Sequence, residues 1–156
     1  MIEVEVETAA WTQALPEAEA VVVKAAAEGL RVLHREAGED VSNSVSILLT
    51  DDAALADLNG RFLGKPYPTN VLSFPAPPNP EGHLGDIALA YGVCAREAAE
   101  QDKTLEQHLM HLTVHGVLHL LGYDHESDGE AEVMEALERA VLEVLGVPDP
   151  YAAERP

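Results

Sequence analysis

The sequence of 156 residues contains a single cysteine, Cys94, so no disulfide can form within the chain. A disulfide-stapled extracellular scaffold is therefore excluded, and a free thiol in the interior is expected instead. No apolar run reaches the roughly 18 residues that a membrane-spanning helix needs. The N-terminal residues MIEVEVE are acidic where a secretion signal carries basic and apolar residues. Together these absences predict a cytoplasmic protein that does not associate with a membrane.

Basic residues are scarce as well. The chain has nine Lys and Arg against 28 Asp and Glu, which gives a formal net charge of −19. A nucleic-acid-binding surface normally shows a cluster of basic residues, so the overall charge does not indicate one. The acidity is typical of a very soluble protein, and it also favours a basic protein partner through long-range attraction.

The residues that are present fit one globular domain. Hydrophobic residues make up 47% of the chain, enough for an ordinary core at this length, and neither repeats nor a long linker divide it. We expect the domain to span residues 1–150. Gly146, Pro148 and Pro150 are typical of a helix end followed by irregular chain, so residues 151–156 are expected to form a loose tail.

Local patterns predict four strands and five helices. Apolar residues that alternate with Glu, and β-branched runs bounded by turn residues, predict strands over 2–6, 44–50, 69–75 and 83–91. Helical spacing of apolar residues, with capping signals at several ends, predicts helices over 16–37, 53–63, 92–101, 104–121 and 128–146. Strands gather early and helices late, which favours an α+β fold over a doubly wound α/β fold.

The last predicted helix has an apolar line along one side. The line consists of residues four apart, Val133, Leu137, Val141 and Leu145. Such a line predicts the side by which the helix packs on the rest of the domain.

The stretch HGVLHLLGYDH, residues 115–125, contains the strongest functional pattern. Its histidines at 115, 119 and 125, with a glycine between the last two, have the spacing His-x-x-x-His-x-x-Gly-x-x-His of zinc metalloprotease ligands. Two further histidines, His108 and His111, precede the motif on the same predicted helix. A single ion cannot bind the four histidines of that helix, at 108, 111, 115 and 119, since His111 and His119 lie roughly 12 Å apart along a helix.

Residues four apart on a helix can share one ion, which leaves His111 with His115 or His115 with His119. Gly122 favours the second pair, because a glycine at a helix end allows a left-handed turn. The chain can then return and bring His125 beside His119, whereas no such third partner is visible for His111. We therefore predict His115, His119 and His125 as ligands, and assign His111 to packing or to support of a ligand.

Three imidazoles suit one Zn²⁺ ion, although Ni²⁺ and Co²⁺ accept the same nitrogens. A closed structural site would need a fourth protein ligand, and the sequence offers no Cys pair. A fourth position held by water is therefore expected, as in catalytic sites, where zinc lowers the pKa of its water to about 7. Gly116, however, stands where a zinc protease has its Glu general base. An anionic substrate group such as phosphate is favoured, because neutral imidazoles leave the charge of the ion uncancelled.

Asp86 follows Gly85 in the predicted strand 83–91, at a point where glycine permits close approach of another backbone. A structural hydrogen bond is the expected role of this carboxylate. The functional alternative is a hydrogen bond from a zinc-binding histidine to this carboxylate, which would orient the ring.

Three segments of the chain resemble the YbeY endoribonucleases, a family also described as ribosomal RNA maturation factors. They are HGVLHLLGYDH (115–125), PTNVLSFP (68–75), which extends back to LNGRFLGKPYPTNVLSFP (58–75), and LGDIAL (84–89). Their order along the chain is that of the family. The resemblance implies a zinc-dependent, single-strand-specific endoribonuclease that acts in maturation of small-subunit ribosomal RNA and in ribosome quality control.

The resemblance also implies a ligand set and a fold. One Zn²⁺ ion would be bound by His115, His119 and His125, which would act in catalysis through the metal and its water. The implied fold is a single α+β domain with a small four-stranded mixed sheet, mostly parallel with one antiparallel edge, packed with about five helices. Ribosomal RNA is the implied substrate. A basic ribosomal protein or the small ribosomal subunit is an expected partner, and no nucleotide cofactor is expected.

One position departs from the family pattern. The family carries an Arg, important for RNA cleavage, five residues before the Pro-Thr of the PTNVLSFP block, and Leu63 stands there. Arg61 is a candidate catalytic replacement only if the helix has ended, because two residues turn a continuous helix by about 200°. Lys65, in the loop that follows, is the other candidate.

Two other functions fit part of the sequence. A zinc hydrolase that acts on peptides or small molecules is supported by the histidine spacing and opposed by Gly116. A non-enzymatic ribosome-assembly factor with a vestigial or structural metal site is supported by Leu63, because the family Arg is missing there.

Overall fold

Four strands and six helices make up the part of the chain that the structure describes. The structure is a computed structural model, and it describes residues 1–37 and 43–151. In chain order the elements are β1 (Ile2–Val6), α1 (Ala9–Ala14), α2 (Ala18–Ala37), β2 (Ser44–Thr50), α3 (Asp52–Leu63), β3 (Val71–Pro75), β4 (His83–Ala90), α4 (Tyr91–Glu100), α5 (Leu105–Leu120) and α6 (Asp128–Val144). All nine predicted elements are present, with ends that differ by at most two residues.

The strands form one mixed sheet in the order β1-β2-β4-β3. β1, β2 and β4 run parallel, with Val4 opposite Ile47 and Ile47 opposite Ile87. β3 lies at the edge and pairs antiparallel with β4, so that Ser73 is opposite Ile87. The predicted α+β fold, with a mostly parallel sheet and one antiparallel edge strand, is therefore confirmed.

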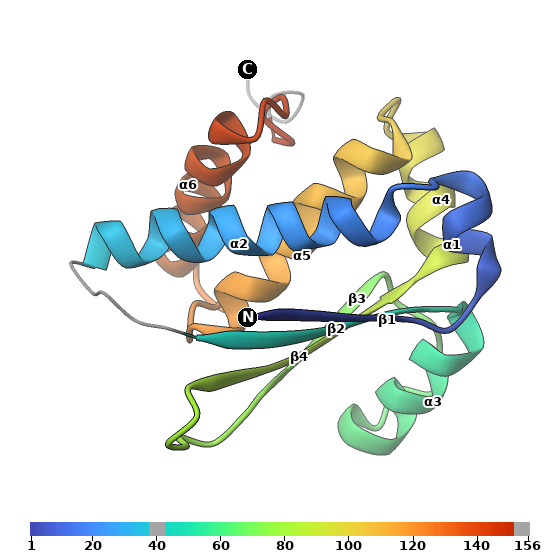
Figure 1. Cartoon of the computed structure of the whole chain (residues 1–156), viewed down its shortest axis with the longest axis horizontal. Helices are drawn as coiled ribbons and strands as arrows, with labels where there is room; N and C mark the ends of the chain where they lie inside the picture. The colour runs from blue at the N-terminus through green and yellow to red at the C-terminus, as the bar shows by residue number, and fades with distance from the viewer. Residues whose placement is uncertain (38–42, 152–156) are drawn as a thin grey trace.

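Helices α2, α5 and α6 cover one face of the sheet, and α3 lies on the other face (Figure 1). Val45, Ile47 and Leu49 of β2 point to the first face and belong to the main core. Ala88 of β4 belongs to a smaller cluster with Leu55 of α3. Because helices cover both faces, the C-terminal halves of the central strands β2 and β4 are largely buried, as is typical of parallel strands.

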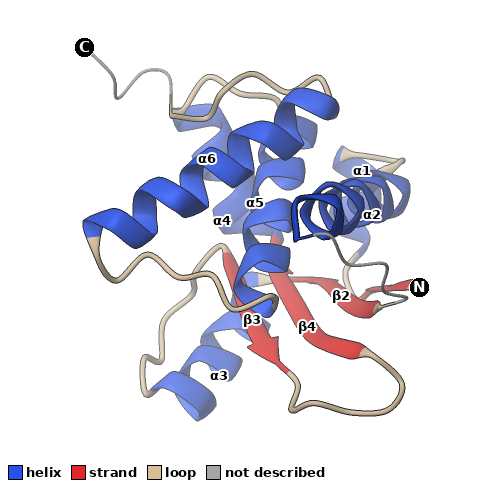
Figure 2. Cartoon of the chain, turned by 90° about the vertical axis from the view of Figure 1, so that its left-hand side faces the viewer, coloured by secondary structure: helices blue, strands red, loops and turns tan. Residues whose placement is uncertain are grey.

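Within the helical layer, α5 lies at the centre, between α6 and α2 (Figure 2). It contacts both of these helices and also reaches β3 and β4 of the sheet. The helix that carries the histidines is therefore the one most enclosed by the rest of the fold.

The sixth helix, α1, was not predicted. It has only six residues, too few for a helical period to show in the sequence. Thr8 caps its N-terminus, and Trp11 is completely buried, with Nε1 donating to the carbonyl oxygen of Thr50 at 2.9 Å. A single anchoring tryptophan thus fixes this helix against the end of β2.

The buried side of α6 overlaps the predicted apolar line except at its first residue. Val133 is 53% exposed, and the buried residues of this helix are Met134, Glu138, Val141 and Leu142. Leu137, Val141 and Leu145 of the predicted line pack on the main core, which confirms the prediction for these three residues, and it was wrong for Val133. The buried residues Met134 and Glu138 lie beside this line, and Glu138, being acidic, does not stand out in an apolar pattern.

Three further expectations concern the interior and the end of the chain. Cys94 is a buried free thiol, as predicted, and burial raises the pKa of that thiol. None of the helices in the described ranges is long and apolar enough to cross a membrane. Of the expected tail 151–156, the structure describes Tyr151, whose hydroxyl donates a hydrogen bond to Glu138, and residues 152–156 lie outside the described chain.

Candidate metal centre

Both ends of α5 are defined by local sequence. The hydroxyl of Thr104 accepts from the Gln107 N–H at 3.0 Å, and the Gln107 side chain accepts from the Thr104 N–H at 3.2 Å, which confirms the predicted capping box. At the other end Gly122 has φ 97°, and the Tyr123 N–H donates to the Leu118 carbonyl at 3.0 Å. The chain therefore reverses after Gly122, in the left-handed conformation that glycine tolerates.

The reversal brings three histidine rings together. One ring nitrogen from each of His115, His119 and His125 lies within 4.8 Å of the other two. The Nε2 atoms of His115 and His119 are 3.0 Å apart, and the His125 ring centroid is 5.6 Å from that of His115 and 5.2 Å from that of His119. These separations fit three nitrogens around one ion, since zinc–nitrogen bonds measure about 2.0–2.1 Å.

The surroundings of His119 favour the neutral form of its ring. His115 and His119 are half-buried, and His125 is exposed. Burial lowers the pKa of His119, and the positive charges that His115 and His125 would carry lower it further. A neutral imidazole has the free lone pair that a metal ion binds.

The other two histidines of α5 stay outside the cluster. Nε2 of His111 lies 3.1 Å from Oε2 of Glu138, and Nε2 of His108 lies 2.9 Å from Oε1 of Glu97. Each ring is therefore paired with a carboxylate of a neighbouring helix. The structure groups His111 with a residue that also contacts His115, which agrees with a supporting position.

Glu138 is the site residue that the sequence analysis missed. Its carboxylate is completely buried on α6, where Oε1 lies 2.5 Å from Nδ1 of His115 and Oε2 accepts from His111 and from the hydroxyl of Tyr151. Burial by itself would raise the pKa of this carboxyl, but the hydrogen bonds from His111 and His115 outweigh it and lower the pKa to about 2. The group is thus a carboxylate at neutral pH. Glu138 lies among the buried residues Met134 and Val141 of α6, but no local sequence pattern marks it, because only the packing of α6 on α5 brings it to His115.

Gly116 faces the sheet rather than the histidine cluster. A Cβ at this position would lie 3.0 Å from two carbon atoms of Ile87 and 3.2 Å from Oγ of Ser73. The Ser73 hydroxyl donates to the Gly116 carbonyl at 3.2 Å. α5 therefore touches β3 and β4 at a point where a side chain would require Ile87 or Ser73 to shift, which gives a packing reason for glycine where a protease has Glu.

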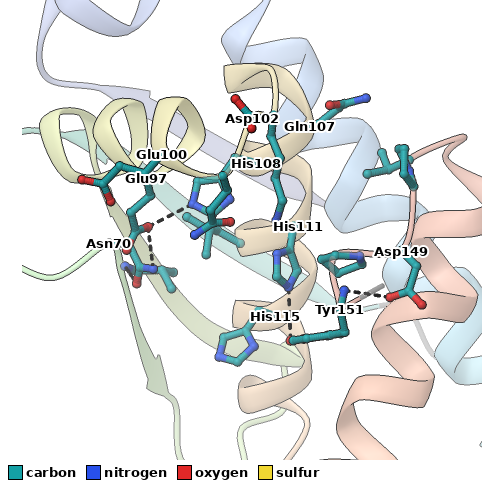
Figure 3. A pocket seen from close by; sticks show the side chains of 17 residues that line it. Asn70, Glu97, Glu100, Asp102, Gln107, His108, His111, His115, Asp149 and Tyr151 are labelled. Carbon is teal, nitrogen blue, oxygen red and sulfur yellow. Dashed lines mark hydrogen bonds and ion pairs between the residues drawn. The ribbon is translucent and has the colours of Figure 1, made fainter. Parts of the chain in front are cut away.

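A cavity of about 780 Å³ opens beside His115. The N-terminal half of α5, the end of α4 and the segment 147–151 form its walls (Figure 3). On one side Glu97 accepts hydrogen bonds from His108 and, at 3.0 Å, from Asn70. Four carboxylates and one lysine line the cavity, so its charge suits a neutral or cationic group better than a phosphate.

The candidate replacements for the family Arg lie at the end of α3. The helix continues through Leu63 and ends at Gly64, which has φ 70°. The condition under which Arg61 could take the place of the family Arg is therefore not met, and its guanidinium instead pairs with Asp57 at 2.9 Å on the exposed side of the helix. Lys65 follows in the loop and is exposed.

Asp86 has an exposed side chain, and its Oδ1 lies 3.5 Å from Nε2 of His83. The carboxylate that contacts a histidine of the cluster is Glu138, and the structural hydrogen bond expected of Asp86 stays a prediction. The close approach predicted at Gly85 is confirmed, because a Cβ there would overlap the carbonyl oxygen of Phe74.

The fold and the histidine cluster define a small α+β protein with a candidate metal centre of the hydrolase type. A family model described as Endoribonuclease YbeY matches residues 5–146. An Endoribonuclease YbeY of Nitrobacter winogradskyi is 50% identical over 143 residues, which cover 86% of this chain and 74% of that protein. An Endoribonuclease YbeY of a Bradyrhizobium species is 51% identical over 145 residues, covering 88% and 84%. The chain therefore belongs to the YbeY endoribonuclease family, as its motifs indicated.

A solved structure supports the fold. The solution structure of a Thermotoga maritima protein matches with a TM-score of 0.59 at 23% identity, over 99% of this chain and 92% of that one. At this identity the likeness shows a common fold.

Proposed function

We propose that this protein is a zinc-dependent endoribonuclease that cleaves single-stranded RNA, in maturation of the small-subunit ribosomal RNA and in ribosome quality control. Such a substrate would place the protein in the cytoplasm. The observation that carries the proposal is the convergence of His115, His119 and His125 in a member of the YbeY family. The name of the relatives, Endoribonuclease YbeY, supports the reaction class.

His115, His119 and His125 would hold one Zn²⁺ ion through three ring nitrogens. Within the described chain no cysteine or carboxylate belongs to the same cluster, so the donor set fits zinc with a fourth position open to solvent. When bound, the ion would supply Lewis acidity to a water molecule and to a phosphate oxygen of the substrate.

The residues of the site favour a phosphodiester over a peptide substrate. Three neutral imidazoles carry no negative charge, so the site keeps the charge of its ion and attracts an anionic phosphate. Gly116 provides no general base, and its position faces the sheet rather than the histidine cluster. We therefore expect no peptidase activity in an assay with added zinc, and measurable activity there would favour the rival hydrolase.

Cleavage of a single-stranded oligonucleotide from small-subunit ribosomal RNA tests the proposal. The zinc-loaded wild type should cleave it, and His119→Ala should lose more than about a hundredfold of the rate, because the ion loses a ligand. His83→Ala is the matched control. His83 lies on β4, where its Nδ1 is 3.0 Å from Oγ of Ser44, and it does not belong to the cluster. Equal rates for the wild type and His119→Ala would contradict the proposal.

The acidity of the chain bears on delivery of the substrate. A net charge of −19 opposes association with RNA over long distances. Salt screens charges over about 8–10 Å, so a bound ion can still act on a phosphate held near it. We propose that a basic ribosomal protein on the small subunit brings the RNA to the site.

Leu63 favours one second function, that of a non-enzymatic assembly factor with a structural or vestigial metal site. Under this alternative, cells with His115→Ala would keep normal ribosome assembly, whereas an enzyme would lose its function. A structural ion would also reveal itself on chelation, because its removal unfolds the domain.

A further inference from the structure

The two ring nitrogens of His115 face different groups. Nε2 lies 3.0 Å from Nε2 of His119, inside the cluster, whereas Nδ1 lies 2.5 Å from Oε1 of Glu138, outside it. A carboxylate only accepts hydrogen bonds, so Nδ1 must carry the proton. Nε2 is then left with its lone pair directed into the cluster, which is the form that binds a metal ion.

The carboxylate of Glu138 is itself held from several directions. Oε2 accepts from Nε2 of His111 at 3.1 Å and from the hydroxyl of Tyr151, while Oε1 accepts from His115. The side chain is completely buried, and a buried charge persists only where hydrogen bonds compensate it. The three donors come from α5 and from the segment after α6, so the carboxylate has one well-defined position.

We propose that Glu138 is a positioning residue of the metal centre and that its carboxylate fixes the ring orientation and the tautomer of His115. His111 and Tyr151 in turn hold this carboxylate in place. This inference rests on the proposed function, because it assigns a role toward the ion that the three histidines would bind. Tyr151 comes from the segment that walls the cavity beside His115, and its ring approaches His111 there (Figure 3). The C-terminal segment therefore takes part in building the centre.

Zinc affinity of the metal-free protein tests the role of Glu138. Glu138→Gln keeps the shape of the side chain but replaces one acceptor oxygen by a donor. We expect the zinc Kd to rise about tenfold to hundredfold in competition with a chromophoric chelator, the usual effect of losing a carboxylate behind a ligating histidine. Glu97→Gln is the matched control. Glu97 pairs with His108, which lies on α5 like His115 but outside the cluster, so this variant should leave the zinc Kd unchanged.

A second variant covers the case in which Glu138→Gln does not fold. Tyr151→Phe keeps Glu138 and its contact with His115 but removes one of the donors that hold the carboxylate. A smaller rise in the zinc Kd, of about threefold to tenfold, is expected. Tyr67→Phe, which alters an exposed tyrosine, serves as its control.

The tautomer of His115 gives a readout that a merely structural ion pair would not predict. In the metal-free wild type, nitrogen NMR shifts should show His115 with its proton on Nδ1. A proton on Nε2 would overturn the inference, whether or not the variants fold. A mixed population in Tyr151→Phe would support it, because the carboxylate would then be held less firmly.

The outcomes separate the inference from the proposed function. If the wild type binds zinc and all variants bind it equally, the positioning role is wrong and the metal centre stands. If the wild type binds no zinc, the proposed metal centre fails, and the inference fails with it. If zinc binding responds to the variants as expected but the wild type does not cleave RNA, the positioning role stands and the proposed activity fails.

Discussion

Leu63 is the last residue of α3 and is 56% exposed, so a longer charged side chain fits there without steric cost. We expect Leu63→Arg to raise the rate of single-stranded RNA cleavage by about tenfold, because a hydrogen bond from a guanidinium to a phosphate contributes roughly 1.5 kcal/mol. Leu63→Met, which adds no charge, is the control and should leave the rate unchanged. Equal rates for the two variants would show that this position does not meet the substrate.

His108 should make the stability of the domain depend on pH. Its ring is buried, and this burial lowers its pKa although the hydrogen bond to Glu97 opposes the shift. The unfolded chain therefore binds the proton more readily, and the free energy of unfolding falls as the pH drops through the ordinary histidine value of about 6.5. Urea unfolding of the metal-free protein between about pH 8 and pH 5.5 measures this effect. The free energy of unfolding should depend less steeply on pH in His108→Gln than in the wild type. Identical profiles for variant and wild type would contradict this.

Residues of the candidate site differ in how far the sequence reveals them. His115, His119 and His125 lie within eleven residues, and helix geometry with one glycine turn sets their grouping, so spacing was enough to predict it. Glu138 and Tyr151 reach the cluster only because α6 and the segment after it pack against α5. No local pattern fixes that packing, and these two residues were therefore missed.

At the scale of elements, the contact between α5 and the sheet depends on Gly116. Gly116→Ala should lower the free energy of unfolding by about 1–3 kcal/mol, because its methyl group would press on Ile87 and Ser73 and push the helix off the sheet. Gly129→Ala in α6 is the control, since nothing lies within 4 Å of its added carbon. Gly129→Ala should leave the free energy of unfolding unchanged or raise it by about 0.5–1 kcal/mol. Urea unfolding measures both, and an equal effect in the two variants would argue against tight packing at Gly116.

The elements also show where periodicity is a weak guide. The capping box of Thr104 and Gln107 located the start of α5, because that signal is local. The predicted side of α6 was right for Leu137, Val141 and Leu145 and wrong for Val133, because only the tertiary contact decides how far along the helix the buried side extends. α1 escaped prediction because one buried residue, Trp11, fixes a helix too short to carry a pattern.

At the scale of the whole molecule, the net charge of −19 should keep the affinity for naked RNA low. We expect a Kd above about 10 µM near physiological salt, within the range of weak non-specific binding. Fluorescence anisotropy with a labelled single strand and the His119→Ala variant, which should not cleave it, measures this affinity. Tight binding in the absence of any partner would show that the chain needs no basic protein to deliver its substrate.

The fold class followed from the order of the elements, because early strands and late helices favour an α+β arrangement. The pairing of strands did not follow from the patterns alone. β2 joins β4 across α3 and β3, and such non-local contacts leave no trace in local spacing. The resemblance to the YbeY family provided the expectation of a mostly parallel sheet, and the observed order confirms it.

Anomalous X-ray scattering at the zinc edge, from crystals of the zinc-loaded protein, tests the central claim most directly. The account predicts one strong peak per chain, about 2.0–2.1 Å from a ring nitrogen of each of His115, His119 and His125, with no fourth protein ligand. A peak elsewhere in the molecule, or a fourth side chain that closes the coordination sphere, would contradict it.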